Sequence, residues 1–209
     1  VLGPDGEFVP YDAISRSTFI GEILGFDDEE MQYLFNKAKE YKKDVHIPIA
    51  LMQFNGMRIS EALAIQVKDI DLKNNTIQVT KQTKALKKSK HGKSKGLVPP
   101  KTANSVRTIP LSNEVAQIVL DGRYEKKDEF LFTQKNGDFA VKSAWTKSYM
   151  TPFLKSIGWI GKFQKPNHDL RKYYGSKKVQ KLVPTQIVAK WMGTSVEVLN
   201  KTYAKEISN

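Results

Sequence analysis

Two of the five arginines in this chain lie where a guanidinium could bind a phosphate. A guanidinium is a planar fork that grips two phosphate oxygens and stays charged at any working pH, whereas a lysine acts as a point charge. Arg58 stands three residues before Glu61, and Arg171 stands three residues after His168, so each pair shares one helical face. Taken alone, the first pair is better explained by a structural ion pair than by a phosphate site.

A basic segment, residues 81–107, contains no acidic residue and nine lysines and arginines. This composition predicts a basic hairpin or loop. Its tip, 85–96, is either a solvated, mobile segment or a phosphate-contacting one, and both interpretations hold if it becomes ordered only on DNA. We expect DNA contacts from five side chains of this segment: Lys84, Lys87, Lys88, Lys95 and Arg107.

The overall composition favours a polyanionic partner. The formal net charge of +12 suits nucleic acid or an anionic membrane surface. No run of about 18 apolar residues and no export signal is present, so we expect a soluble, cytoplasmic protein and no membrane partner. With no cysteine and only three histidines, the chain has few ligands for a metal, and we expect chemistry without metal or other cofactors.

The elements that must position these residues are mostly helical. Residues 1–26 resemble a linker or the tail of a preceding domain. An amphipathic helix is predicted from 27 to 43, a second from 48 to 54, and, after the Asn55-Gly56 break, a third from 58 to 66. The later helical patterns cover 113–121, 140–157, 168–181, 184–192 and 195–205.

Between the early and late helices the hydrophobic period changes to that of strands. Three strands are predicted, at 70–72, 76–80 and 106–111, the first two joined by a turn at Asn74-Asn75. The predicted fold class is therefore α+β, mainly helical with a small three-stranded antiparallel sheet. We assign 27–209 to one domain.

Four segments of the sequence resemble the signature of tyrosine recombinases of the phage integrase family. Residues 54–63 read FNGMRISEAL, residues 100–111 read PKTANSVRTIPL, residues 168–171 read HDLR, and Met192-Gly193 is followed by Tyr203. Single pieces are common, but four in this order on helix, hairpin, helix and helix are specific. The resemblance covers about residues 27 to 206 and implies the catalytic domain of a site-specific DNA recombinase.

The resemblance also implies roles. Arg58 and Arg171 hold the scissile phosphate, Lys101 protonates the leaving 5′-oxygen, and Tyr203 is the nucleophile. His168 accepts the tyrosine proton, and Glu61 supports the cations. A 3′-phosphotyrosine intermediate keeps the energy of the broken bond, so neither metal nor ATP is needed. The implied partners are double-stranded DNA at specific recombination sites, three further copies in a tetramer, and accessory DNA-bending or excision factors.

One position departs from the family pattern, and it keeps other functions open. Thr194 stands where His or Trp is usual, with eight residues between it and Tyr203, and offers only a hydroxyl hydrogen bond. A catalytically weak DNA-binding relative and a type IB topoisomerase-like enzyme are therefore alternatives. Trp191 is expected to pack in the core rather than to substitute. The sequence identifies neither the target site nor the mobile element.

Two further groups receive structural interpretations. Tyr173 and Tyr174 are possible rival nucleophiles, but we expect them to pack against neighbouring elements. Asp69 and Asp71 alternate as metal-nuclease carboxylates would, and solvation at a strand edge is the preferred explanation.

Overall fold

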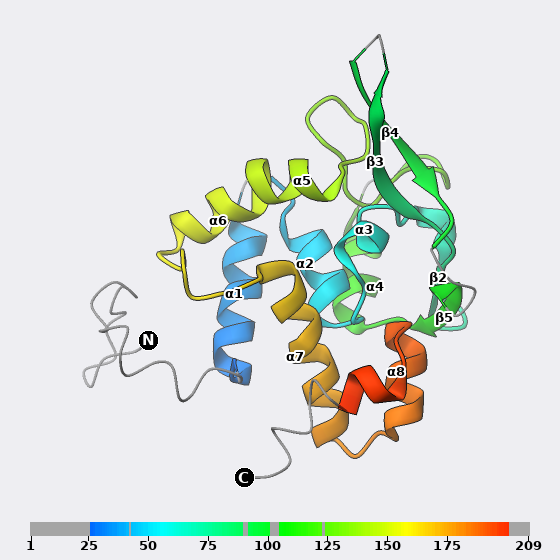
Figure 1. The fold of residues 1–209 in the computed structure, drawn as a ribbon, viewed down its shortest axis with the longest axis vertical. Helices are drawn as coiled ribbons and strands as arrows, with labels where there is room; N and C mark the ends of the chain where they lie inside the picture. The colour runs from blue at the N-terminus through cyan, green and yellow to red at the C-terminus, as the bar shows by residue number, and fades with distance from the viewer. Residues whose placement is uncertain (1–25, 42, 90–91, 101–104, 123, 201–209) are drawn as a thin grey trace.

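The fold is mainly helical, with a small sheet and a long hairpin, as predicted (Figure 1). It is seen in a computed structural model that describes residues 26–41, 43–89, 92–100, 105–122 and 124–200. The helices are α1 (Asp28–Glu40), α2 (His46–Gln53), α3 (Ile59–Ala62), α4 (Asn113–Asp121), α5 (Lys142–Trp145), α6 (Thr151–Ser156), α7 (Pro166–Gln180) and α8 (Thr185–Met192). The strands are β1 (Ile70–Asp71), β2 (Thr76–Val79), β3 (Gln82–Ser89), β4 (Gly92–Val98) and β5 (Arg107–Pro110).

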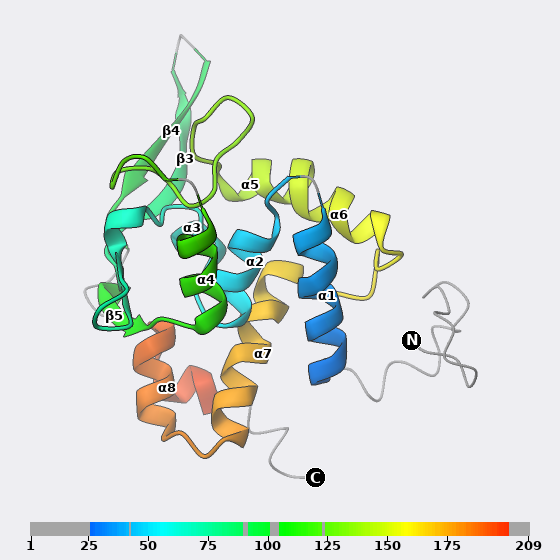
Figure 2. The ribbon, with the colours of Figure 1, turned by 180° about the vertical axis from the view of Figure 1, so that it is seen from behind.

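Helix α2 lies at the centre of the helical part. Nearly all of its residues are buried, and it contacts α1, α3, α4 and α7. Helix α7 covers it on the near side in Figure 1, and α4 covers it on the near side in Figure 2. Helix α1 buries Met31, Leu34, Phe35 and Ala38 on one face, so the predicted amphipathic helix is present. Its start is fixed by Asp27, whose carboxylate accepts a hydrogen bond of 2.7 Å from the Glu30 N–H.

The three-stranded sheet has the order β1-β2-β5 and is antiparallel throughout. Ile77 pairs with Ile70 on one side and with Ile109 on the other. The turn between β1 and β2 is shaped by Asp71, whose carboxylate accepts from the N–H groups of Lys73 and Asn74. The predicted strands and turn are confirmed.

A second, two-stranded antiparallel sheet is formed by β3 and β4, which carry most of the basic segment. The predicted hairpin is therefore present, and it projects from the body at the top of Figure 1. Its register shifts between Ala85 and Lys88, which marks a bulge or irregularity.

The predicted helix from 58 to 66 is too long. Helix α3 ends at Ala62 because the next residues pair with a distant segment instead. The Leu131 N–H donates to the Ile65 carbonyl at 3.0 Å, and the Val67 N–H donates to the Glu129 carbonyl at 2.9 Å. Long-range pairing thus replaces the next helical turn. The predicted helix from 140 to 157 is continuous but holds a π-helical stretch, Thr146–Met150, between α5 and α6.

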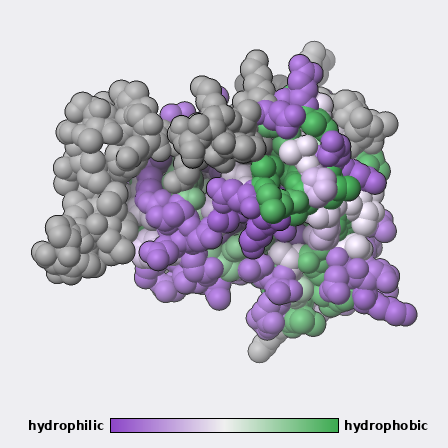
Figure 3. Space-filling view, turned by 90° about the horizontal axis from the view of Figure 1, so that it is seen from below, coloured by the Kyte–Doolittle hydropathy of each residue, from purple (hydrophilic) through white to green (hydrophobic). Residues whose placement is uncertain are grey.

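The surface is largely hydrophilic when seen from below, with smaller apolar areas (Figure 3). Exposed aliphatic side chains include Leu182, Ile187 and Val198, in and around α8. In the described part of the chain, no helix combines the length and apolar character needed to cross a membrane.

An aromatic cluster holds the α5–α6 stretch on the core and gives a test of the packing. Phe132 is 1% exposed and meets the rings of Trp145 and Tyr149 edge to face, at centroid distances of 5.2 and 5.1 Å. We expect Phe132→Ala to lower the free energy of unfolding by about 3–5 kcal/mol, measured by urea denaturation. The control, Leu120→Ala, alters a side chain that is 65% exposed and should stay within about 0.5 kcal/mol of wild type. A loss below about 1 kcal/mol for Phe132→Ala would contradict this packing.

Candidate active site

Three arginines from three elements bind the carboxyl end of α8. Nε of Arg107, on β5, donates to the Trp191 carbonyl at 2.6 Å, and Nη2 of Arg171, on α7, donates to the Met192 carbonyl at 2.6 Å. Nη2 of Arg58, at the start of α3, donates to the Gly193 carbonyl at 2.5 Å. The last carbonyls of a helix lack partners within it and carry the negative end of its dipole. The guanidinium groups supply the missing hydrogen-bond donors and place positive charge at the negative end of the dipole. We call this set of contacts the arginine–carbonyl joint.

Two glycines allow the close approach. Gly193 ends α8 with a left-handed φ of 62°, and a Cβ atom there would lie 2.9 Å from Nη1 of Arg107. Gly56 has a φ of 64°, and its Cβ would lie 2.3 Å from Cδ1 of Tyr174. The Gly56 carbonyl also accepts from Nη1 of Arg171 at 2.6 Å. A side chain at either position would both strain the backbone and displace a neighbour.

Glu61 is the carboxylate that unites two of these arginines. It is 2% exposed and accepts from Nη1 and Nη2 of Arg107 at 3.1 and 2.8 Å. It also accepts from the N–H and Nη1 of Arg58 at 2.9 and 3.0 Å. Burial opposes its ionisation, but the hydrogen bonds and charges of Arg107 and Arg58 outweigh burial and hold the pKa of Glu61 below its ordinary value. Glu61 therefore remains ionised.

The prediction that Arg107 contacts DNA needs correction. The Arg107 side chain is 3% exposed and is engaged by Glu61, Trp191 and the Ser105 carbonyl, the last at 2.9 Å. It lies beneath the surface, where it supports the site from behind. Lys95 also has partners within the protein: its ammonium forms an ion pair of 2.7 Å with Asp138 and donates to the Phe139 carbonyl at 2.5 Å. Its side chain is still 26% exposed, and its contact with DNA stays a prediction.

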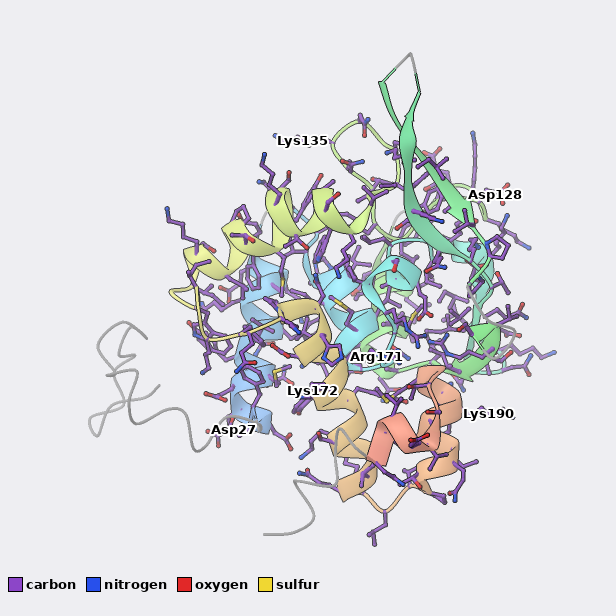
Figure 4. The ribbon with its side chains drawn as sticks, in the orientation of Figure 1. Asp27, Asp128, Lys135, Arg171, Lys172 and Lys190 are labelled. Carbon is purple, nitrogen blue, oxygen red and sulfur yellow. The ribbon has the colours of Figure 1, made fainter. Side chains whose placement is uncertain are left out.

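A cleft of about 350 Å³ opens in front of this joint. It is lined by Arg58, His168, Arg171 and Thr194, four of the residues predicted from the sequence. Figure 4 shows Arg171 on α7. The Arg58 side chain is 39% exposed, while Arg171 is only 8% exposed. The five N–H donors of a guanidinium let an arginine hold a backbone carbonyl and still contact a ligand.

His168 lies in the first turn of α7, exposed at the mouth of the cleft. Desolvation by the surrounding protein lowers its pKa. The carboxylate of Asp169 opposes that effect, and the charges of Lys172 and Arg171 reinforce it. His168 is thus neutral at neutral pH and able to accept a proton. The neighbouring Asn167 anchors this turn, because its side-chain oxygen accepts from Nε1 of Trp145 at 2.9 Å.

Several predicted site residues lie outside the described part of the structure. They are Lys101, Tyr203 and the side chains of Lys87 and Lys88. Lys84 is described, and its side chain is exposed on β3.

The rival tyrosines have structural roles. The Tyr173 hydroxyl donates to Asp28 at 2.6 Å, and burial together with that carboxylate raises its pKa. Tyr174 is 5% exposed, and burial raises its pKa to about 12. Trp191 packs against the main core, as predicted. These contacts support the structural roles expected for Tyr173, Tyr174 and Trp191.

Asp69 is not a solvated residue at a strand edge, which corrects that prediction. It is 8% exposed and forms an ion pair with Lys81 at 2.5 Å. Within the described residues, no group of three or more His, Asp or Glu side chains is arranged to hold a metal ion.

Several residues that build the site were missed by sequence reasoning. The carbonyls of residues 191–193 give no sequence signal, because every residue type carries one. Asn167, Lys142 and Lys172 also line the cleft, and only the last has a signal, its position four residues after His168 on the same helical face.

A mainly helical domain with two arginines and a histidine around one cleft is the arrangement of a tyrosine recombinase catalytic domain. The phage integrase family matches residues 25–207, and the chain belongs to this family. It is 25% identical over 194 residues to "Tyrosine recombinase XerC-like" of Caldanaerobacter subterraneus subsp. tengcongensis, which covers 83% of this chain and 48% of the relative. It is 35% identical over 79 residues to the integrase of Staphylococcus phage L54a, covering 38% of this chain and 22% of the relative. The matched part of the chain thus spans about half the length of the first relative and 22% of the length of the second.

Solved structures share the fold. The Tn1549 transposon integrase in complex with a circular intermediate DNA superposes with a TM-score of 0.70 at 20% identity, covering 86% of this chain and 61% of that chain. The catalytic domain of bacteriophage HP1 integrase superposes with a TM-score of 0.57 at 16% identity, covering 88% of each chain.

The buried Glu61 predicts a pH-dependent stability. A carboxylate with a lowered folded-state pKa contributes stability that is present above its ordinary value, here 4.5, and is lost as the pH falls through the lower folded value. Glu61→Gln leaves Arg107 buried without a counter-charge, so we expect a loss of about 3–5 kcal/mol at neutral pH that shrinks under acid conditions. Urea denaturation across this pH range measures it, with the exposed Glu125→Gln as control. A loss that stays constant as the pH falls would contradict the assigned charge.

Proposed function

We propose that this chain is the catalytic domain of a site-specific DNA recombinase or integrase that cuts and rejoins DNA through a 3′-phosphotyrosine at Tyr203. The observation that carries the proposal is the meeting of Arg58, Arg171 and His168 at one cleft, with Glu61 buried behind it. Family membership supports the same reading.

The proposed first step is attack on the scissile phosphate. The Tyr203 hydroxyl gives its proton to His168, and its oxygen forms a bond to phosphorus. Negative charge builds on the nonbridging oxygens, and Arg58 and Arg171 stabilise it from positions that are fixed before DNA arrives. Their fixation by backbone carbonyls and Glu61 means that little reorganisation is needed during the reaction.

The proposed second half of the step releases the 5′ end. The bond between phosphorus and the 5′-oxygen breaks, and Lys101 gives that oxygen a proton. Attack by a 5′-hydroxyl on the phosphotyrosine reverses these events and rejoins DNA, so the bond energy is conserved and no metal or ATP is consumed.

The proposed partner is double-stranded DNA at specific recombination sites. The net charge of +12 and the projecting β3–β4 hairpin, with the exposed Lys84, support phosphate contact. Two relatives by fold were solved on DNA, the Tn1549 integrase with a circular intermediate and the XerH recombinase with its difH substrate. By analogy with family behaviour, we propose a tetramer on two DNA sites, with accessory DNA-bending or excision factors, acting on DNA in the bacterial cytoplasm.

A second candidate function rests on Thr194. It lines the cleft but brings no charge and only one hydroxyl donor. A catalytically weak DNA-binding relative would have the same fold and cleft. The two candidates differ in whether a covalent protein–DNA adduct forms.

Adduct formation is the direct test. On a duplex nicked near the crossover, the released strand diffuses away, so we expect a covalent 3′-phosphotyrosyl adduct to accumulate on a denaturing gel. Mass spectrometry should place the DNA on Tyr203, and Tyr203→Phe should abolish the adduct. Recovery of DNA on Tyr173 or Tyr174 would overturn the assignment of the nucleophile, and absence of any adduct would favour the DNA-binding alternative.

The role of Lys101 can be tested through the leaving group. A bridging 5′-sulfur departs with little need for an acid. We expect Lys101→Ala to cleave ordinary DNA on the order of 100-fold more slowly than wild type, and to approach wild-type rates on DNA with a 5′-phosphorothiolate at the scissile bond.

The exposed Lys84→Ala is the matched control for Lys101→Ala. It should weaken binding and reduce the salt dependence of the affinity, with no such rescue. Equal defects of Lys101→Ala on both substrates would show that Lys101 binds phosphate and that another group supplies the proton.

A further inference from the structure

The cleft holds more positive charge than the two arginines supply. Lys142, at the start of α5, and Lys172, on α7, also line it, and none of its lining residues is acidic. Two lysines elsewhere form ion pairs with acids: Lys81 with Asp69, and Lys177 with Asp28. Across the residues that the structure describes, no ion pair involves Lys142 or Lys172. Uncompensated cations in a concave site favour an anionic ligand.

Lys172 is the lysine best placed to act with the predicted catalytic residues. It follows His168 by four residues and Arg171 by one, so His168 and Lys172 share one face of α7. Figure 4 shows it next to Arg171 on this helix. Its side chain is half-buried, whereas that of Lys142 is exposed. A half-buried ammonium is screened less by solvent than an exposed one.

We propose that Lys172 is a further phosphate-binding residue of this cleft, whose ammonium donates to a nonbridging oxygen of the scissile phosphate beside Arg58 and Arg171. This inference rests on the function proposed above. Thr194, which also lines the cleft, gives a neutral hydroxyl only, so Lys172 adds a full charge to those of Arg58 and Arg171. A charge-assisted hydrogen bond is about twice as strong as a neutral one.

Lys172 also has an effect on the neighbouring base. Its charge lowers the pKa of His168, together with desolvation and the charges of Arg171 and Lys165, and against the carboxylate of Asp169. Two further cations, Arg58 and Lys142, also line the cleft. Removing the positive charge of Lys172 should therefore raise the pKa of His168, while Lys172→Arg, which keeps the charge, should leave it nearly unchanged.

The kinetic test compares wild type and Lys172→Met on two substrates that differ in the charge of the scissile phosphate. A methylphosphonate at the scissile position replaces one charged nonbridging oxygen with a methyl group, so a cation that neutralises that oxygen becomes dispensable. On ordinary nicked DNA, we expect Lys172→Met to form the covalent adduct on the order of 10- to 100-fold more slowly than wild type. On the methylphosphonate substrate, this difference should fall to about 3-fold or less.

Three variants serve as controls. Lys172→Arg should retain most of the wild-type rate. Lys155→Met, an exposed lysine on α6 outside the cleft, should match wild type on both substrates. Lys142→Met should lack the selective relief by methylphosphonate, and relief for Lys142→Met without relief for Lys172→Met would overturn the assignment.

A second measurement does not depend on activity. In the DNA-free protein, an NMR titration of His168 should give a higher pKa in Lys172→Met than in wild type and in Lys155→Met. An unchanged pKa, with equal kinetic defects on the two substrates, would overturn the role of Lys172. If wild type itself forms no adduct, the proposed function fails, whereas an active wild type with an unaffected Lys172→Met removes only this inference.

Discussion

The arginine–carbonyl joint is the contact on which the rest of the site depends. Three carbonyls in succession, from Trp191 to Gly193, each accept from an arginine of a different element. These elements are β5, α7 and the start of α3, which are far apart in the sequence. The joint therefore fixes the sheet, the central helices and the end of α8 relative to one another.

The joint resolves a conflict between burial and charge. Two cationic groups, Arg107 and Arg171, are almost fully buried, which is costly without partners. Arg107 is matched by the ionised Glu61, and Arg171 is held by two carbonyls, those of Gly56 and Met192. The cost is thus offset within the fold. What remains is a positively charged cleft whose arginines are held in place by backbone carbonyls and by Glu61.

The sequence predicted the residues better than their surroundings. The amphipathic helix α1, the three strands of the small sheet and the cluster of Arg58, His168 and Arg171 followed from spacing and family pattern. The burial of Arg107 was not predicted, because a charged residue in a basic segment is expected at the surface. Only the tertiary structure shows that the buried carboxylate of Glu61 pairs with it. The end of α3 was missed for a similar reason, since pairing with residues 129–131 overrides helical preference.

In the proposed mechanism, Arg58 and Arg171 hold one phosphate while Arg107 binds Glu61 and the Trp191 carbonyl behind them. A crystal structure of this protein on nicked DNA from its own element would test it most directly. We expect Arg58 and Arg171 both to contact nonbridging oxygens of the same scissile phosphate, with Arg107 still bonded to Glu61 and to the Trp191 carbonyl. An Arg107 guanidinium turned out onto the DNA, or a scissile phosphate beyond the reach of Arg58 and Arg171, would contradict it.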